Sequence, residues 1–190
     1  INGKFLNENS NIGGLDPYSA SKSSQDIIAN SYKSSFFKKN KNLIIIRAGN
    51  IIGGGDFDYS RIVPELFHSI FNNKTLVLRN PFAIRPWQHI FDVVHAIVLI
   101  IFHSYKKIQS KAIIYNIGPD KTSNIKVVEL VKKIKKRINK FDFVKNKNIL
   151  FYETKILKLS NQLIKKKIRW KPLINISKTI DLTIDWYEKF

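Results

Sequence analysis

A tyrosine and a lysine stand four residues apart near the start of the chain, in the stretch GGLDPYSASKSSQD. On a helix, residues i and i+4 share one face, so Tyr18 and Lys22 would lie side by side. A phenol is a poor proton acceptor at neutral pH, and a neighbouring ammonium group favours its ionised form. The pair therefore suits a general base that takes the proton from a substrate hydroxyl. Because lysine is abundant, about one such pair is expected by chance, and two unrelated residues at a helix start are the alternative.

Arginine is scarce in this sequence, which holds 6 of them, and three fall in the middle third of the chain. Arg61, Arg79 and Arg85 lie around a glycine-rich stretch, Gly53 to Asp56. A guanidinium can hold phosphate oxygens through two parallel hydrogen bonds, so this group suits a diphosphate. Aspartates close in sequence leave ordinary ion pairing as the alternative.

The glycine-rich stretch has two interpretations of its own. It follows a predicted strand, as phosphate-binding loops do, but it has the spacing neither of a P-loop nor of a dinucleotide fingerprint. A tight turn that needs a positive φ is equally compatible. No metal site is expected, because the chain has no cysteine and its histidines lack zinc-site spacing. These histidines are His68, His89, His95 and His103.

The formal net charge of +19 raises the possibility of a nucleic-acid-binding protein. About three quarters of the lysines follow Tyr105, many on helical segments with an apolar stripe opposite, and no aromatic residues alternate with them as stacking would need. This pattern favours a compositional bias on solvated faces. The absence of cysteine fits a reducing compartment, so we expect a cytoplasmic protein. The longest apolar runs are too short to cross a membrane.

The elements that must position these residues alternate between helices and apolar strands, which predicts an α/β fold with a parallel sheet. We expect strands at 43–47, 75–79, 112–118 and 148–153. The segment 80–89, NPFAIRPWQH, has two prolines and is predicted to be a loop.

Six helices are predicted, at 20–37, 62–71, 92–103, 127–138, 161–168 and 176–187. Asp16 and Ser19 are the capping candidates for the first, with Pro17 at its start. The third is apolar nearly all round, so we expect it to be buried behind a cap at Asp92. Ser123 or Asn124 is expected to cap the fourth.

These segments together resemble the extended short-chain dehydrogenase/reductase family of nucleotide-sugar enzymes. The resemblance rests on DPYSASK, RAGNIIGGGD, SRIVPEL, YNIGP and IRWKP…TIDWY, in the order of the family. The segment RNPFAIRPWQHI is similar to that of the CDP-glucose 4,6-dehydratases within it. The implied fold is the later part of a Rossmann-like parallel sheet interleaved with a small α/β nucleotide-sugar-binding domain. The implied division is 1–48 Rossmann, 49–80 substrate domain, 81–120 mixed and returning to Rossmann, and 121–190 substrate domain.

The resemblance implies an NAD-dependent lyase that dehydrates CDP-glucose to CDP-4-dehydro-6-deoxyglucose, a step toward the deoxysugars of O-antigen and other surface polysaccharides. Tyr18 would take the proton from the hydroxyl on sugar carbon 4 as hydride passes to NAD. Lys22 would also hold the nicotinamide ribose. The full-length enzyme is expected to be a homo-oligomer, with no membrane or nucleic-acid partner.

The same resemblance implies a set of substrate-binding residues in the middle of the chain. Asn50 would lie against the sugar diphosphate. Arg61 and Arg85 would bind the nucleotide diphosphate, and Arg79 and Asn80 would lie toward the base.

The sequence departs from the family at several points. The glycine-rich dinucleotide fingerprint and the Thr-Asp-Lys segment that supplies further acid and base groups are absent, and the chain starts at Ile1 without methionine. We therefore expect a C-terminal fragment, inactive alone, with both segments upstream. The usual Leu-Asp near the C-terminus is Leu159-Ser160 here. Another nucleotide-sugar epimerase or dehydratase is the first alternative, and a non-catalytic nucleic-acid-binding fragment is the alternative of another class.

Overall fold

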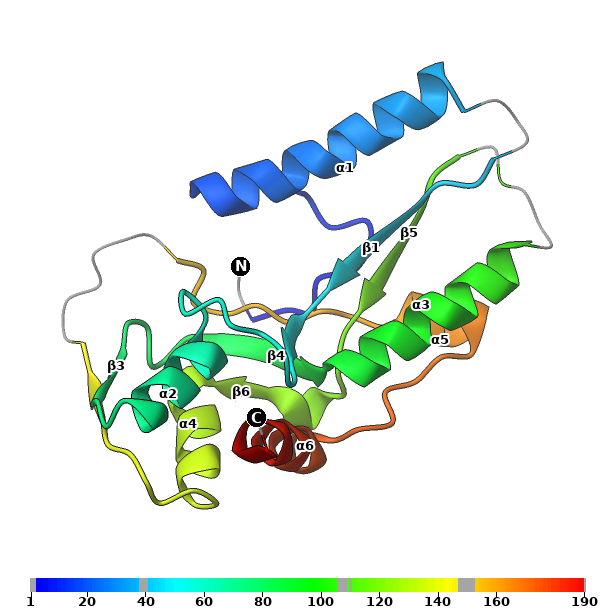
Figure 1. Ribbon diagram of the computed structural model, residues 1–190. Helices are drawn as coiled ribbons and strands as arrows, with labels where there is room; N and C mark the ends of the chain where they lie inside the picture. The colour runs from blue at the N-terminus through cyan, green and yellow to red at the C-terminus, as the bar shows by residue number, and fades with distance from the viewer. Residues whose placement is uncertain (1–2, 38–40, 106–108, 110, 147–152, 190) are drawn as a thin grey trace.

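The structure is a computed structural model that describes residues 3–37, 41–105, 109, 111–146 and 153–189 of the 190-residue chain. Helices and strands alternate along it (Figure 1). In chain order they are α1 (Pro17–Ser35), β1 (Ile44–Ala48), β2 (Asn50–Ile52), α2 (Ile62–Phe71), β3 (Leu76–Leu78), β4 (Ile84–His89), α3 (Ile90–Tyr105), β5 (Ile113–Ile117), η1 (Lys121–Ser123), β6 (Asn124–Lys126), α4 (Val127–Lys135), β7 (Phe143–Lys145), α5 (Gln162–Ile168) and α6 (Ile176–Lys189). No described helix is both long enough and apolar enough to cross a bilayer.

Parallel strand pairing confirms the predicted α/β fold. β1 and β5 run parallel, with Ile45 opposite Ile114, and α1 lies above them in Figure 1. Parallel neighbours need a long crossover, and here it contains β2, α2, β3, β4 and α3. The backbone of Gly49 continues the contact just beyond β1, where its N–H donates to the carbonyl of Ile117 at 2.9 Å. The first sheet therefore ends where the second begins.

The second sheet has the order β2-β4-β6 and carries two of the predicted substrate residues. β2 is parallel to β4, with Asn50 opposite Trp87, and β6 is antiparallel to β4, with Ile125 opposite Arg85. A third, two-stranded sheet pairs β3 with β7, which the sequence analysis did not predict. The proposed domain limits at 48, 80 and 120 stay a prediction.

Helix α1 begins at Pro17 rather than at the predicted residue 20, and Asp16, one of the two capping candidates, is its N-cap. The Asp16 carboxylate accepts the N–H of Ser19 at 2.8 Å and its hydroxyl at 2.7 Å, and Pro17 takes the first helical position. These hydrogen bonds lower the pKa of Asp16, because they favour the charged carboxylate. The N-terminal end of the helix that carries Tyr18 and Lys22 is therefore fixed in place.

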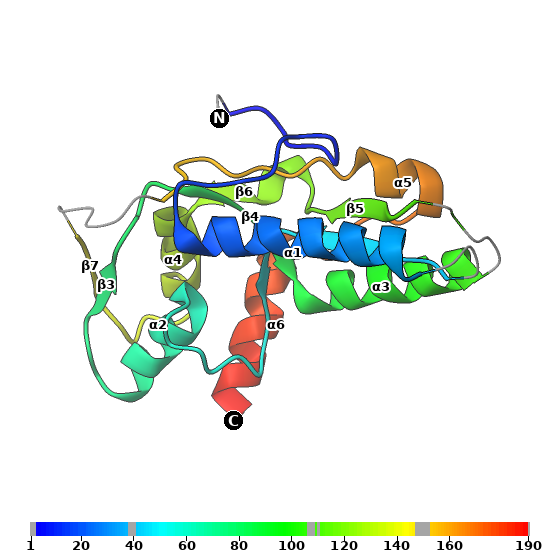
Figure 2. The ribbon, with the colours of Figure 1, turned by 90° about the horizontal axis from the view of Figure 1, so that it is seen from above.

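Two hydrophobic clusters hold the helices onto the strands. The larger joins α2, α4 and α6 to β3 and β4, and the smaller joins α3 and α5 to β5. Figure 2 shows α3 and α5 flanking β5, and α2, α4 and α6 gathered at the other end of the molecule. Ile52, Val63 and Trp87 belong to the larger cluster. The walls that they form of the cleft described below are therefore held by the hydrophobic core.

The predicted loop at 80–89 is wrong for its second half, which forms β4. Proline lacks the N–H that a sheet uses, which is why two prolines favoured a loop. Pro86 lies where the partner of β4 changes: β6 pairs with Ile84 to Pro86, and β2 pairs from Trp87 onward. A proline at the ends of both ladders removes few sheet hydrogen bonds, so the strand tolerates it.

Helix α3 differs from its prediction in two ways. It starts at Ile90, and the buried Asp92 carboxylate instead accepts the backbone N–H groups of Leu173 and Ile174 at 2.9 and 3.1 Å. It is also not buried all round, because large apolar side chains along it are exposed in this structure. These are Phe91, Val94, Val98, Ile101, Phe102 and Tyr105.

Helix α4 has the predicted apolar stripe but a different start. Neither Ser123 nor Asn124 caps it, because Asn124 already begins β6 and the N-cap is Lys126. The Glu129 carboxylate accepts the Lys126 N–H at 3.2 Å, which satisfies one of the free donors at the helix start. The strand predicted at 148–153 lies outside the described residues except for Glu153.

Candidate functional site

The predicted substrate residues meet in one cleft of about 800 Å³. It lies between β2, the glycine-rich turn, the start of α2 and β4. The residues assigned from the sequence that line it are Asn50, Arg61, Arg79, Asn80 and Arg85. The lining also includes residues that the sequence analysis did not select, among them Ser60, Trp87, Ile90, Val127, Asn146 and Glu153. A cleft of this volume is the size of a small-molecule site.

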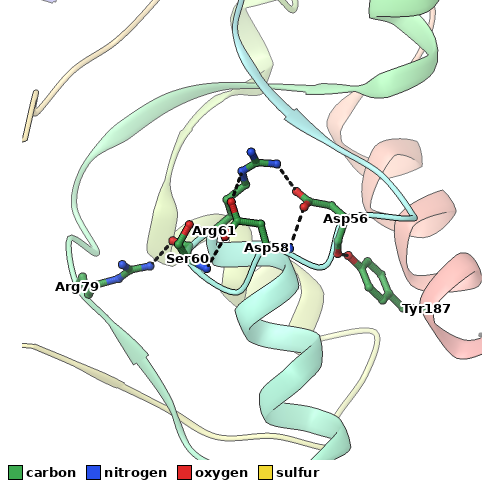
Figure 3. A network of polar contacts seen from close by, with 6 residues as sticks. All are labelled: Asp56, Asp58, Ser60, Arg61, Arg79 and Tyr187. Carbon is green, nitrogen blue, oxygen red and sulfur yellow. Dashed lines mark hydrogen bonds and ion pairs between the residues drawn. The ribbon is translucent and has the colours of Figure 1, made fainter. Parts of the chain in front are cut away.

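Arg61 is held at the N-terminus of α2 by two aspartates, as Figure 3 shows. Its guanidinium lies 3.0 Å from an Asp56 oxygen and 3.4 Å from an Asp58 oxygen. The hydrogen bond with Asp56, and then its charge, raise the pKa of Arg61, with smaller contributions from Asp58 and Tyr18. The Arg61 side chain is still 64% exposed, so it can also meet a ligand.

Arg79 reaches the same network from the end of β3 (Figure 3). Its guanidinium donates to the Ser60 carbonyl at 2.6 Å and to Glu65 at 3.0 Å. The Ser60 hydroxyl and N–H both donate to Asp58, and these bonds lower the pKa of Asp58. Arg61 and Arg79 are therefore joined through one loop.

Arg85 lies deeper than the other two arginines. Its side chain is 8% exposed, and it donates to the Ile84 carbonyl at 2.9 Å and to the Glu153 carboxylate. The other oxygen of Glu153 accepts from the Asn80 amide at 3.0 Å. All three arginines of the cleft thus have carboxylate partners, as the ion-pair interpretation expects, while their binding of a diphosphate stays a prediction.

The glycine-rich turn is both a tight turn and part of the cleft wall. Gly55 has a φ of +82°, which favours glycine. A Cβ at Gly53 would lie 2.7 Å from Ile90, and one at Gly54 would lie 2.1 Å from Trp186. All three glycines line the cleft. Close packing explains why the turn needs glycine, and the turn itself forms part of the cleft wall.

Helix α6 fastens this turn from behind. The Tyr187 hydroxyl donates to the backbone carbonyl of Asp56 (Figure 3). The Tyr187 ring stacks on that of Phe67, with centroids 3.9 Å apart. Burial, and then the charge of Asp56, raise the pKa of Tyr187 to about 12. The phenol therefore stays protonated and serves as a hydrogen-bond donor.

Tyr18 and Lys22 share one face of α1, as their spacing predicts. The Lys22 ammonium lies 5.7 Å from the centroid of the Tyr18 ring and 3.4 Å from the Gln25 side-chain oxygen. Neither residue lines the cleft, and Tyr18 is 71% exposed. Tyr18 is nevertheless close enough to Arg61 to affect it electrostatically. The pair lies beside the cleft and open to a further ligand.

No histidine is among the residues that line the cleft, and the described residues contain no cluster of three or more His, Asp or Glu side chains suited to a metal. His89 is buried, and its Nδ1 accepts the Phe91 N–H at 3.2 Å.

The sequence analysis missed the acidic partners of two arginines, Glu65 and Glu153. No signal in the sequence singled out Glu153, because 14 of the 190 residues are acidic and half of these follow Tyr105. Scarcity selected the arginines, of which there are 6, but the same reasoning does not select one carboxylate among 14.

A sequence model described as GDP-mannose 4,6 dehydratase matches residues 2–183. The chain belongs to this family. Among curated proteins, the CDP-glucose 4,6-dehydratase of Salmonella typhimurium is 29% identical over 191 residues, which cover 95% of this chain and 52% of that enzyme. The family thus confirms the resemblance drawn from the sequence.

Solved structures share the fold of this GDP-mannose 4,6 dehydratase family member. A dTDP-glucose 4,6-dehydratase from Bacillus anthracis, in complex with NAD, superposes with a TM-score of 0.79 at 22% identity over 100% of this chain and 57% of its own. A UDP-glucose-4-epimerase from Stenotrophomonas maltophila, with bound NAD and a formylated UDP-arabinopyranose, superposes with a TM-score of 0.81 at 15% identity. The match covers 97% of this chain and 58% of the epimerase. The chain spans about half the length of these relatives.

Proposed function

We propose that the chain supplies the substrate cleft and the tyrosine–lysine pair of an NAD-dependent CDP-glucose 4,6-dehydratase. The observation that carries this proposal is the cleft, where three arginines and two asparagines selected from the sequence line one space of about 800 Å³. The 29% identity to the Salmonella CDP-glucose 4,6-dehydratase supports the choice of substrate.

The charges of the cleft suit a nucleoside diphosphate. Guanidinium forks bind phosphate oxygens bidentately, and Arg61, Arg79 and Arg85 approach from three different elements. In this structure carboxylates partly neutralise the three arginines and also hold them in place. A diphosphate would therefore bind guanidinium groups that are already oriented. Arg85 and Arg61 are assigned to the diphosphate, Asn50 to its sugar side, and Arg79 and Asn80 to the base side.

The exposed face of α1 fits the ribose and nicotinamide end of NAD. Tyr18 and Lys22 offer a phenol and an ammonium group on one open face, and both side chains are exposed. When bound, NAD supplies an acceptor for a hydride and later returns it.

Tyr18 is assigned the proton transfer. Its phenolate would take the proton from the hydroxyl on sugar carbon 4, and the Lys22 ammonium would stabilise that phenolate. The resulting ketone acidifies carbon 5, which allows water to leave from carbon 6.

Product analysis with the full-length protein tests this proposal. CDP-glucose, dTDP-glucose and GDP-mannose are each incubated with the protein and NAD, and 4-keto sugar is measured. We expect turnover with CDP-glucose at a kcat/KM at least tenfold above the other two. Preference for another nucleotide sugar, or interconversion of epimers without loss of water, would instead identify the alternative, a different dehydratase or an epimerase.

The rival class, a nucleic-acid-binding protein, rests on the +19 charge alone. A salt titration separates the two, because counterion release makes true nucleic-acid binding fall steeply with salt. We further assign the enzyme to the cytoplasm, to deoxysugar synthesis for O-antigen or other surface polysaccharides, and to a homo-oligomeric state.

A further inference from the structure

We propose that Glu153 is a positioning residue of the cleft, where it orients Arg85, assigned to the diphosphate, together with Asn80, assigned to the base side. This inference rests on the proposed function, since it assumes that those two residues meet the nucleotide. The Glu153 carboxylate uses one oxygen for each partner, Arg85 and the Asn80 amide. One side chain therefore sets the orientation of two residues of the cleft.

Burial makes Arg85 the arginine that needs such a partner. Its side chain is 8% exposed, whereas those of Arg61 and Arg79 are 64% and 61% exposed. Exposed ion pairs contribute little to stability or orientation, because water screens and solvates both charges. Removal of the counter-ion of a buried guanidinium strongly destabilises the folded protein. Glu153 thus determines the orientation of the Arg85 side chain.

The backbone fixes Glu153 relative to Arg85. The Ile84 N–H donates to the Lys155 carbonyl at 2.9 Å, and the Leu157 N–H donates to the Ile84 carbonyl at 3.0 Å. These bonds attach the segment that follows Glu153 alongside the start of β4, where Ile84 and Ile156 form a parallel bridge. The residue before Arg85 is therefore tied directly to the segment that carries its carboxylate.

Among the described residues, two acceptors are found for Arg85, which leaves further N–H donors for a ligand. A guanidinium has five N–H donors. The Ile84 carbonyl and Glu153 are the acceptors found for Arg85, and Arg85 lines the cleft. A fork held on one edge by the protein can present its other edge to phosphate oxygens without a change of rotamer.

A competing interpretation makes Glu153 a substitute ligand that occupies Arg85 until an anion displaces it. The two interpretations predict opposite effects of Glu153→Gln, a substitution of the same size that removes the charge. A positioning residue predicts weaker nucleotide binding, because the fork loses its orientation. A substitute ligand predicts tighter binding, because a competitor has been removed.

The experiment measures CDP binding by calorimetry, with KM and kcat for CDP-glucose, in the full-length protein. We expect Glu153→Gln to weaken CDP binding about tenfold and to raise KM similarly, with kcat nearly unchanged, because a hydrogen bond to a charged group is lost. Glu153→Asp should recover part of the loss. In an Arg85→Ala background, Glu153→Gln should have a much smaller effect, because only its action through Asn80 remains. Asp120→Asn, which removes an exposed partner of Lys165 outside the cleft, is the matched control and should leave CDP binding unchanged.

Each result of these measurements supports or overturns the positioning role of Glu153. If the wild-type protein does not bind CDP, the proposed function and this inference both fail. If it binds CDP and Glu153→Gln binds equally or more tightly, or if the effect persists undiminished without Arg85, only the positioning role is overturned. A fall in melting temperature with unchanged CDP affinity would make Glu153 merely structural. Should Glu153→Gln not fold, Glu153→Asp carries the same comparison.

Discussion

The indole of Trp186 lies directly against Gly54, so that a Cβ on this glycine would fall 2.1 Å from the ring. The last helix of the chain thus closes the back of the turn that forms one wall of the cleft. Any side chain at position 54 must move the turn or the indole.

Gly54→Ala should therefore lower the free energy of unfolding by about 1 to 3 kcal/mol, the usual cost of overpacking. It should also raise the KM for CDP-glucose, because the turn carries Asp56, the partner of Arg61. Urea unfolding and steady-state kinetics check both effects. In the double variant Gly54→Ala with Trp186→Ala, the two substitutions should cost less than the sum of their separate effects, because truncation of the indole at Cβ removes the ring atoms nearest the new methyl group. Additive effects would mean that the backbone, not Trp186, is the obstacle.

Tyr18→Phe should remove nearly all turnover of the full-length enzyme while CDP-glucose still binds. The variant keeps the ring but lacks the group that accepts the proton, and loss of a general base costs about 10²-fold or more. Single-turnover assays and equilibrium binding measure the two effects separately. Tyr32→Phe, at a half-exposed position of the same helix, is the control and should retain full activity. A Tyr18→Phe enzyme with more than about half the normal rate would remove Tyr18 from catalysis.

The sequence could predict local structure wherever one signal dominated. Apolar periodicity placed α2 correctly, and its end follows from Asn73, which adopts a left-handed φ of 52°. Pro86 misled the prediction because the cost of a proline depends on which hydrogen bonds the strand makes on each side. The missed β7 has three residues and gives no periodic signal. Such elements are fixed by their tertiary partners.

The site also combines features that local sequence signals predict with features that depend on tertiary contacts. Chemistry and scarcity were enough to select Arg61, Arg79 and Arg85, since a diphosphate needs forked donors. The aspartates that pair with Arg61 could be predicted from their proximity in sequence, but the partner of Arg85 could not, because Glu153 lies 68 residues beyond it. The spacing of Tyr18 and Lys22 showed that they share a face, but the distance from that face to the cleft depends on how α1 packs. Sequence reasoning thus selected residues that line one cleft, but not all of the carboxylates that pair with them.

Arg85→Ala should raise the KM for CDP-glucose more than it lowers kcat, because the diphosphate is remote from the reacting carbons. Loss of a charge-assisted bidentate contact should cost about 2 to 3 kcal/mol, roughly 30- to 150-fold in kcat/KM. Arg85→Lys should recover only part, since an ammonium group lacks the planar fork. Arg137→Ala, which breaks an ion pair with Asp181 away from the cleft, should leave KM unchanged. An unchanged KM in both Arg85 variants would exclude Arg85 from the site.

His89 should make the fold sensitive to acid. Its ring is buried, and burial lowers its pKa below the ordinary 6.5, with the charge of Asp92 partly opposing this. The folded state therefore holds His89 neutral, while the unfolded chain takes up a proton as the pH falls below about 6.5. Stability from this residue is complete above pH 6.5 and is lost as the pH falls toward the lowered pKa.

His89→Asn tests this, because an amide oxygen can replace Nδ1 as acceptor of the Phe91 N–H and does not titrate. Urea midpoints of wild type and variant are compared at pH 7.5 and pH 5.5. We expect the wild type to lose more stability between the two pH values than the variant does, even if the variant is less stable at pH 7.5. His103→Asn, at an exposed position of α3, shows whether removal of any histidine has this effect. Equal losses in the wild type and His89→Asn would mean that acid acts on the fold through other groups, the carboxylates of Asp16 and Asp58 first among them, since their pKa values are lowered in the folded state.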